Sequence, residues 1–173
     1  MKRIIDYLVI ISLLVLAACE SSEGMDVENI PVKVVGVDLV FPANLRDSIL
    51  SYYTAEDNSA WPVTYNLRSA AFKRLVPFDT YKKEMEKGVS GWDLTQVEIV
   101  SVLTNEPDMK VFKVRFFERI NGSVSSKYYS GRIQAGKIVS TDEEVIWKLE
   151  DKSWICVQPG SRLHLPLNEQ MVF

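Results

Sequence analysis

The clearest sheet-forming segment of the chain is Phe112-Lys113-Val114-Arg115-Phe116-Phe117-Glu118-Arg119-Ile120-Asn121-Gly122. Successive side chains of a strand point to opposite faces, so apolar residues at every second position predict a strand with one buried face. That face would carry Phe112, Val114, Phe116 and Ile120, and the other face Lys113, Arg115, Phe117 and Arg119. The closing Asn-Gly favours a type I′ turn, because both central positions of that turn need φ above zero. The segment therefore predicts a strand that enters a hairpin.

Further strands are predicted before and after this hairpin. Val97–Leu103 is apolar at both parities, which indicates burial on both faces, and a turn at Asn105–Asp108 separates it from the segment above. Val124–Ile133 would run back from the hairpin, Ala135-Gly136 would turn again, and Lys137–Val139 would begin a return. These connections are short, as in an antiparallel meander.

The end of the sheet is predicted to be a second hairpin. The polar run Thr141–Glu144 interrupts the return strand, and Val145–Leu149 and Trp154–Val157 then flank a turn at Glu150–Ser153. Cys156 lies within the second of these apolar segments, and a buried thiol is a common core residue. We expect Cys156 to pack in the core.

Helices are predicted before the strands. A four-residue spacing places Phe41, Leu45, Ile49 and Tyr53 on one stripe. Ser59 can cap a second helix, and Pro62 suits its first turn. The stripe of this second helix would contain Trp61, Tyr65, Phe72 and Val76, widened by Leu75, with Ser69 as a polar interruption and Pro77 as the stop.

A third, shorter helix is predicted from Asp79 to Lys87, with Tyr81 and Met85 on one side and Gly88 as its C-terminal stop. Ile30–Val40 is rich in β-branched residues and compatible with a short strand. Helices followed by strands indicate the α+β class. We predict one α+β domain over residues 30–173, with N-terminal helices packed on an antiparallel sheet.

Residues 1–18 have the organisation of an export signal. Lys2 and Arg3 precede the apolar run Tyr7–Leu16, which is shorter than the roughly 20 residues of a spanning helix. The run ends in Leu16-Ala17-Ala18-Cys19, which resembles the lipobox of bacterial lipoproteins. The resemblance implies cleavage before Cys19, addition of acyl chains such as palmitate to it, and anchoring in the bacterial envelope. By the same resemblance, Glu20 rather than Asp after the cysteine favours the outer membrane over the inner one, as in lipoprotein sorting of the enteric type.

Composition restricts the class of partner. The 173-residue chain has a net charge of -3, and without Lys2, Arg3 and Asp6 the remainder has -4. An acidic domain without a basic cluster is not expected to bind nucleic acid. The polar residues 19–29 would form a flexible tether between the anchor and the domain. A domain facing the periplasm is the resulting prediction.

The order of elements resembles the cone-shaped, cystatin-like folds of the nuclear transport factor two-like superfamily. The resemblance rests on Trp147–Val157, similar to the last hairpin of small bacterial lipoproteins of this type, and on the helical segment Trp61–Met85. It implies a curved sheet wrapped around the first helix, with a cavity. The superfamily contains isomerases, dehydratases, binding modules and assembly domains, so the scaffold does not select an activity.

Aromatic side chains are the candidate lining of such a cavity, and they are Trp61, Tyr65, Phe72, Phe112, Phe116 and Trp147. The same residues would otherwise fill the core. Arg115, Arg119 and Arg132 are candidates for a basic patch or for a solvated sheet face.

No residue pattern specifies a reaction or a metal. His164 is the single histidine, alternates with leucines, and has no partner histidine for a metal site. Asp93, Glu98 and the tyrosines at 65, 81, 128 and 129 could serve an isomerase with a buried carboxylate. We expect no cofactor and no metal, and we identify no catalytic residue.

The sequence therefore predicts a lipid-anchored envelope protein whose domain binds a small apolar ligand or another envelope protein without catalysis. Two alternatives stay open. One is an isomerase- or hydratase-like enzyme with a buried carboxylate and tyrosine, and the other is a structural assembly domain, which a homodimer would fit.

Overall fold

The computed structural model describes residues 32–120 and 136–160. The predicted export signal, Cys19, the tether, the Asn121-Gly122 turn, the strand 124–133 and the tail with His164 all lie outside these residues.

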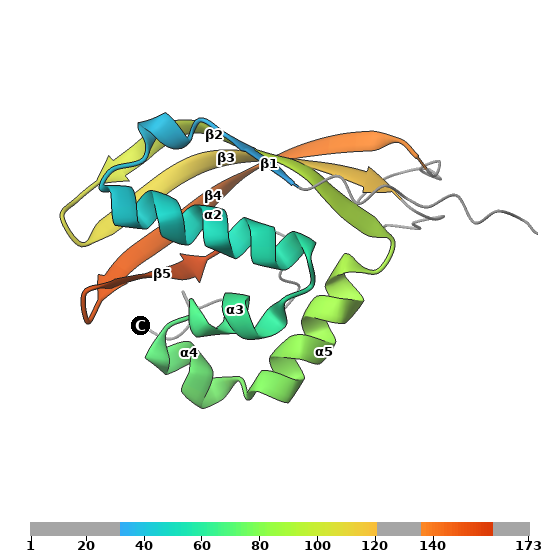
Figure 1. Cartoon of the computed structure of the whole chain (residues 1–173), viewed down its shortest axis with the longest axis horizontal. Coiled ribbons are helices and arrows are strands. Elements are labelled where there is room, and N and C mark those ends of the chain that lie inside the picture. The colour runs from blue at the N-terminus through green and yellow to red at the C-terminus, as the bar shows by residue number, and fades with distance from the viewer. Residues whose placement is uncertain (1–31, 121–135, 161–173) are drawn as a thin grey trace, which may run out of the picture.

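The described chain contains a five-stranded sheet, four α-helices and one short 3-10 helix (Figure 1). In chain order the elements are β1 (Lys33–Val35), η1 (Val37–Leu39), α2 (Ala43–Asp57), α3 (Trp61–Asn66), α4 (Ala70–Leu75), α5 (Phe78–Val89), β2 (Trp92–Asn105), β3 (Met109–Ile120), β4 (Ile138–Glu150) and β5 (Ser153–Gln158). The predicted α+β class is confirmed.

The strand order is β1-β2-β3-β4-β5, with β1 parallel to β2 and the other neighbours antiparallel. The expectation of a wholly antiparallel sheet is therefore wrong at the β1 edge. All four α-helices lie between β1 and β2 in the chain, and a connection of that length can return the chain to the end from which a parallel strand starts.

The alternation predicted for β3 is confirmed. Phe112, Val114, Phe116 and Ile120 are all buried. The main core lies between this face of the sheet and α2, which runs along it in Figure 1, and α2 contributes Leu45, Ile49, Tyr52 and Tyr53. One face of the sheet is thus covered, and residues of the opposite parity form an outer face.

The first predicted stripe is correct except at its beginning. Leu45, Ile49 and Tyr53 are buried, but Phe41 is 69% exposed and lies outside α2. Pro42 is the N-cap and has an extended backbone, so the helix starts at Ala43. The four-residue spacing extends one step beyond the helix by coincidence.

The predicted second helix is two helices, α3 and α4. Ser69 was expected within one helix, but its hydroxyl accepts a hydrogen bond of 3.0 Å from the Phe72 amide and caps α4. The polar side chain therefore starts a helix instead of interrupting one. Ser59 is not a cap, since its φ is 54° and Ala60 occupies that position. Pro62 in the first turn of α3 is confirmed.

The third predicted helix is confirmed as α5, with Tyr81 and Met85 buried. Its bounds differ, because the helix starts at Phe78 and Gly88 lies inside it. Leu75 was expected to widen the second stripe but is exposed at the end of α4.

Two strand predictions are wrong in extent or burial. Thr141–Glu144 does not interrupt the sheet but belongs to β4, whose outer face is polar. Val97–Leu103 is not buried on both faces, because Val100, Val102 and Leu103 are exposed. The register between β2 and β3 shifts at Val100 and Leu103, so each is the extra residue of a bulge, which redirects side chains along the strand.

The predicted final hairpin is confirmed. Leu149 pairs with Trp154, and Asp151 and Lys152 between the strands have φ of 48° and 68°. Positive φ at both central positions is the geometry of a type I′ turn. Cys156 is buried in the main core, as predicted.

A second, smaller hydrophobic cluster lies among α3, α4 and α5. Its buried members are Trp61, Phe72, Val76, Tyr81 and Met85, and Tyr65, Phe78 and Val89 pack against them. The helical layer beyond α2 thus has its own small core.

Candidate functional site

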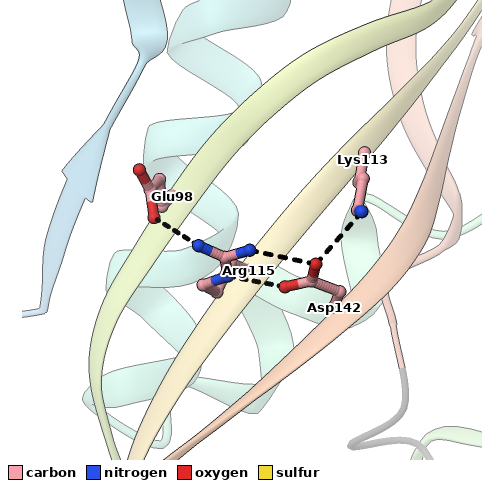
Figure 2. A network of polar contacts seen from close by, with 4 residues as sticks. All are labelled: Glu98, Lys113, Arg115 and Asp142. Atoms are coloured by element: carbon pink, nitrogen blue, oxygen red, sulfur yellow. Dashed lines mark hydrogen bonds and ion pairs between the residues drawn. The ribbon is translucent and has the colours of Figure 1, made fainter.

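Four charged side chains form a network on the outer face of the sheet (Figure 2). Arg115 of β3 stands opposite Glu98 of β2 on one side and Asp142 of β4 on the other. Its Nε and Nη2 atoms donate to the two Asp142 carboxylate oxygens at 2.6 and 3.1 Å, and its Nη1 lies 3.9 Å from Glu98 Oε2. Lys113 Nζ lies 3.1 Å from Asp142 Oδ2. We call these four residues the outer-face network.

The outer-face network lowers the pKa of Asp142, the carboxylate that both of its cations contact. Hydrogen bonds from Arg115 and Lys113 lower the pKa of Asp142 to about 2, and the bond to Asp142 raises the pKa of Arg115. Because all four side chains are substantially exposed, solvent screens these ion pairs and they contribute little to folding. The network fixes the orientation of side chains that face solvent.

Next to the network the outer face carries an open hollow of about 560 Å³. Its lining residues are Leu103, Lys113, Asp142, Glu143, Glu144 and Gln158. Leu103, the extra residue of a bulge in β2, is 49% exposed. Glu144 stands opposite Lys113 on the outer face and has no ion-pair partner within the described part of the chain, whereas Glu143 stands opposite the buried Val114 and has the parity of the covered face. The hollow is therefore polar and net acidic, with one apolar wall.

A separate group of polar side chains is buried where α2, α3 and α5 meet. Tyr81 donates to Thr64 Oγ1 at 2.9 Å, and desolvation raises the pKa of Tyr81 to about 12. The Glu56 carboxylate and the Arg68 guanidinium act on the pKa of both Tyr52 and Tyr81 in opposite directions, so both charges lie near these phenols. All five side chains are buried, with Glu56 at 4% and Arg68 at 2% exposure.

The six aromatic residues predicted to line a cavity lie in two places. Phe112, Phe116 and Trp147 belong to the main core, whereas Trp61 and Phe72 belong to the second cluster. Tyr65 packs against the second cluster and donates to Val76 O at 2.7 Å. The hollow on the outer face is lined by other residues.

The remaining predicted polar residues are also separated. Glu98 belongs to the outer-face network, and Asp93 pairs with Arg119 nearer the start of β2. Tyr81 is in the buried polar group. The other members of the predicted set, Tyr128, Tyr129, Arg132, His164 and Cys19, lie outside the described residues.

Sequence reasoning missed Asp142 and Arg68. Asp142 lies in a run that looks like a loop, although it alternates with Thr141 and Glu143 as a strand residue would. A signal was present, because oppositely charged residues directly across neighbouring strands attract each other. Arg68 lies between two short helices, and nothing local indicates that it is buried.

Residues 32–120 and 136–160 contain neither a candidate metal site nor a candidate membrane span. No cluster of three or more His, Cys, Asp or Glu side chains could hold a metal ion there. No helix of this part is long and apolar enough to cross a bilayer.

Solved structures that loosely resemble this chain include two SEC-C motif proteins. No family model matches the chain, and no curated protein matches it. A SEC-C motif protein from Rhodopseudomonas palustris matches with a TM-score of 0.46 and 13% identity, over 67% of this chain and 73% of that one. A SEC-C motif protein from Psychrobacter arcticus matches with a TM-score of 0.43 and 10% identity, over 68% of this chain and 59% of that one.

Proposed function

We propose that this chain is a lipid-anchored protein of the bacterial envelope, held by acylated Cys19, and that the outer face of its sheet binds another envelope protein without catalysis. The anchor rests on the export signal and on the Leu16-Ala17-Ala18-Cys19 lipobox. The periplasm-facing location follows from that anchor, with the outer membrane favoured by Glu20.

The observation that carries the binding proposal is the hollow of the outer face beside the outer-face network. Its lining is polar and exposed, which suits a protein surface better than an enclosed apolar ligand. Leu103 supplies an apolar contact, and Glu144 supplies a carboxylate that has no ion-pair partner among the described residues. A segment with a basic side chain next to an apolar one is complementary to this hollow.

A photocrosslinking experiment tests the binding face. Benzoylphenylalanine replaces Leu103 in the chain expressed in the envelope of its own cells, and the matched control replaces Val63, a similarly exposed residue on α3. We expect a discrete crosslinked protein at Leu103 that is absent at Val63 and weakened by Glu144→Gln. Equal crosslinking at both positions, or none at Leu103, would contradict the proposal.

The anchor is tested separately. Cells fed an alkyne analogue of palmitate should label the wild-type chain and not Cys19→Ala. If Cys19→Ala is labelled equally, the lipid is attached elsewhere, and if neither chain is labelled, the lipid anchor is absent. Either result contradicts the proposed anchor, whatever the crosslinking experiment shows.

A second candidate function is an isomerase- or hydratase-like enzyme. It is favoured by one observation, since Tyr52 and Glu56 are buried one helical turn apart on α2. A buried carboxyl group beside a phenol can act as an acid or base if substrate reaches it. This candidate, and a small apolar ligand, both require the cone-like cavity of a cystatin-like roll, for which α2 along the covered face of the sheet is the supporting feature.

Native mass spectrometry distinguishes these small-molecule candidates from the protein partner. A reproducible extra mass that is lost on denaturation, and that Glu56→Gln alters, would favour the cavity. A bare chain mass at several protein concentrations would favour the outer face.

A further inference from the structure

The last strand of the sheet has its open edge covered by a loop. The segment Leu67–Ser69, between α3 and α4, lies along β5 on the side away from β4. The Cys156 amide donates to Leu67 O at 2.8 Å, and Arg68 Nη2 donates to Val157 O at 3.2 Å. The loop therefore takes up backbone groups that β5 would otherwise offer to a sixth strand.

A bulge in β5 explains why the Val157 carbonyl is free to accept the hydrogen bond from Arg68. Ile146 pairs with Gln158 and Trp147 with Cys156, so Val157 is an extra residue in the ladder. The extra residue of a bulge is left unpaired by the neighbouring strand. Its carbonyl is satisfied here by a side chain 89 positions earlier in the sequence.

Arg68 also connects the loop to the second cluster. Its guanidinium carbon lies 4.4 Å from the centre of the Phe72 ring, a cation–π arrangement, while Leu67 packs against the main core. Ser69 then caps α4. The three residues thus join two hydrophobic clusters that otherwise have no buried member in common.

The helices α3, α4 and α5, which share the second cluster, are suited to move as a unit. Both α3 and α4 are six residues long, and helices of that length are not stable without tertiary packing. Their packing comes from the small second cluster, and small clusters with few connecting hydrogen bonds open more readily than a main core.

We infer that Leu67–Ser69, which we name the β5 strap, is a latch that opens by local unfolding while the sheet and its main core stay folded. The closed latch protects an edge strand, Ser153–Gln158, that contains no charged residue. Uncharged edges of this kind are prone to pair with other strands, so the strap keeps the domain from associating through β5.

Hydrogen exchange followed by NMR tests the latch in the full chain with Cys19→Ala, in detergent micelles. The Cys156 amide reports the strap, because Leu67 O is its acceptor. The Val114 amide, in a strand flanked by β2 and β4, reports the sheet. We expect Cys156 to exchange at least tenfold faster than Val114, with a rate that hardly changes in low urea while that of Val114 rises. Equal protection and equal urea dependence at the two amides would overturn the inference.

A pair of variants tests the role of Arg68. Arg68→Met keeps the aliphatic bulk and removes the donor to Val157 O, and Arg74→Met on the exposed side of α4 is the matched control. We expect exchange at Cys156 to rise at least tenfold in Arg68→Met with less than a threefold change at Val114, and neither to change in Arg74→Met. A parallel rise at both amides would show that Arg68 supports the whole domain and not a separate latch. If Arg68→Met does not fold, the comparison of exchange at Cys156 and Val114 in the chain without this substitution decides whether the latch exists.

Discussion

Replacing Gly36 with alanine tests the packing of the N-terminal edge of the sheet. Gly36 links β1 to η1 with φ of 75°, and a Cβ added there would lie 2.3 Å from the carbonyl oxygen of Ile99. Gly136 is the matched control, because its φ is 81° but a Cβ would meet nothing within 4 Å. The two substitutions share the cost of a left-handed backbone and differ in the clash.

The left-handed conformation costs an L-residue about 1–2 kcal/mol. The clash adds roughly 1–3 kcal/mol, because Ile99 O is backbone in the middle of β2 and must shift with it or displace β1. We therefore expect Gly36→Ala to lower the free energy of unfolding by about 2–5 kcal/mol and Gly136→Ala by about 1–2 kcal/mol.

Urea unfolding followed by tryptophan fluorescence measures both values. With a slope of about 1.5 kcal/mol/M, an extra 2 kcal/mol lowers the midpoint by roughly 1.3 M. The slope itself should not change. Equal destabilisation of the two variants, within about 0.5 kcal/mol, would refute the close contact between Gly36 and β2.

Three further results are expected. In an NMR titration the Asp142 carboxyl should have a midpoint near 2, and in Arg115→Gln this midpoint should move up toward 3.8, because Arg115 is the first cause of the low pKa. In the unsubstituted chain, the contribution of Asp142 to stability is present above pH 4 and lost as the pH falls through 2. Absorbance at 295 nm should show Tyr52, Tyr53 and Tyr81 ionising at higher pH than free tyrosine in the same buffer. Stability should fall as the pH rises from 10 toward 12, because the buried phenols stay neutral in the folded state, and ionisation of all three phenols at the pH of free tyrosine would contradict their burial. Trp147→Ala should cost about 3–5 kcal/mol in urea unfolding, because Trp147 is fully buried in the main core against Tyr52.

The sequence predicted those elements whose signal is local. The alternation of β3 and the turn at Asp151-Lys152 each depend on neighbouring residues, and both were confirmed. The stripe of α2 was correct from Leu45 onward, because burial against the sheet needs only the helical period. Phe41 was misplaced because Pro42, next to it, starts the helix later than the spacing suggests.

The parts that failed depend on contacts between distant residues. A strand with a polar outer face looks like a loop until its partner is known, and for this reason the sequence of Thr141–Glu144 predicts an interruption where the structure has a strand. Ser69 is compatible with the middle of a helix or with a cap, and tertiary packing of Phe72 selects the cap. The outer-face network needs the register of three strands, and one sequence does not supply that register.

Two arginines show how burial decides whether a charged side chain supports the fold. Arg68 is almost fully buried, so removing its guanidinium leaves Val157 O without its donor and is expected to weaken the packing of the helical layer. Arg115 makes better hydrogen bonds to Asp142, yet solvent reaches both side chains and screens their attraction. Substitutions in the outer-face network should therefore leave the fold intact. For that reason Arg115→Gln can be used in the crosslinking experiment at Leu103, where a lost crosslink in a chain of unchanged stability would report binding alone.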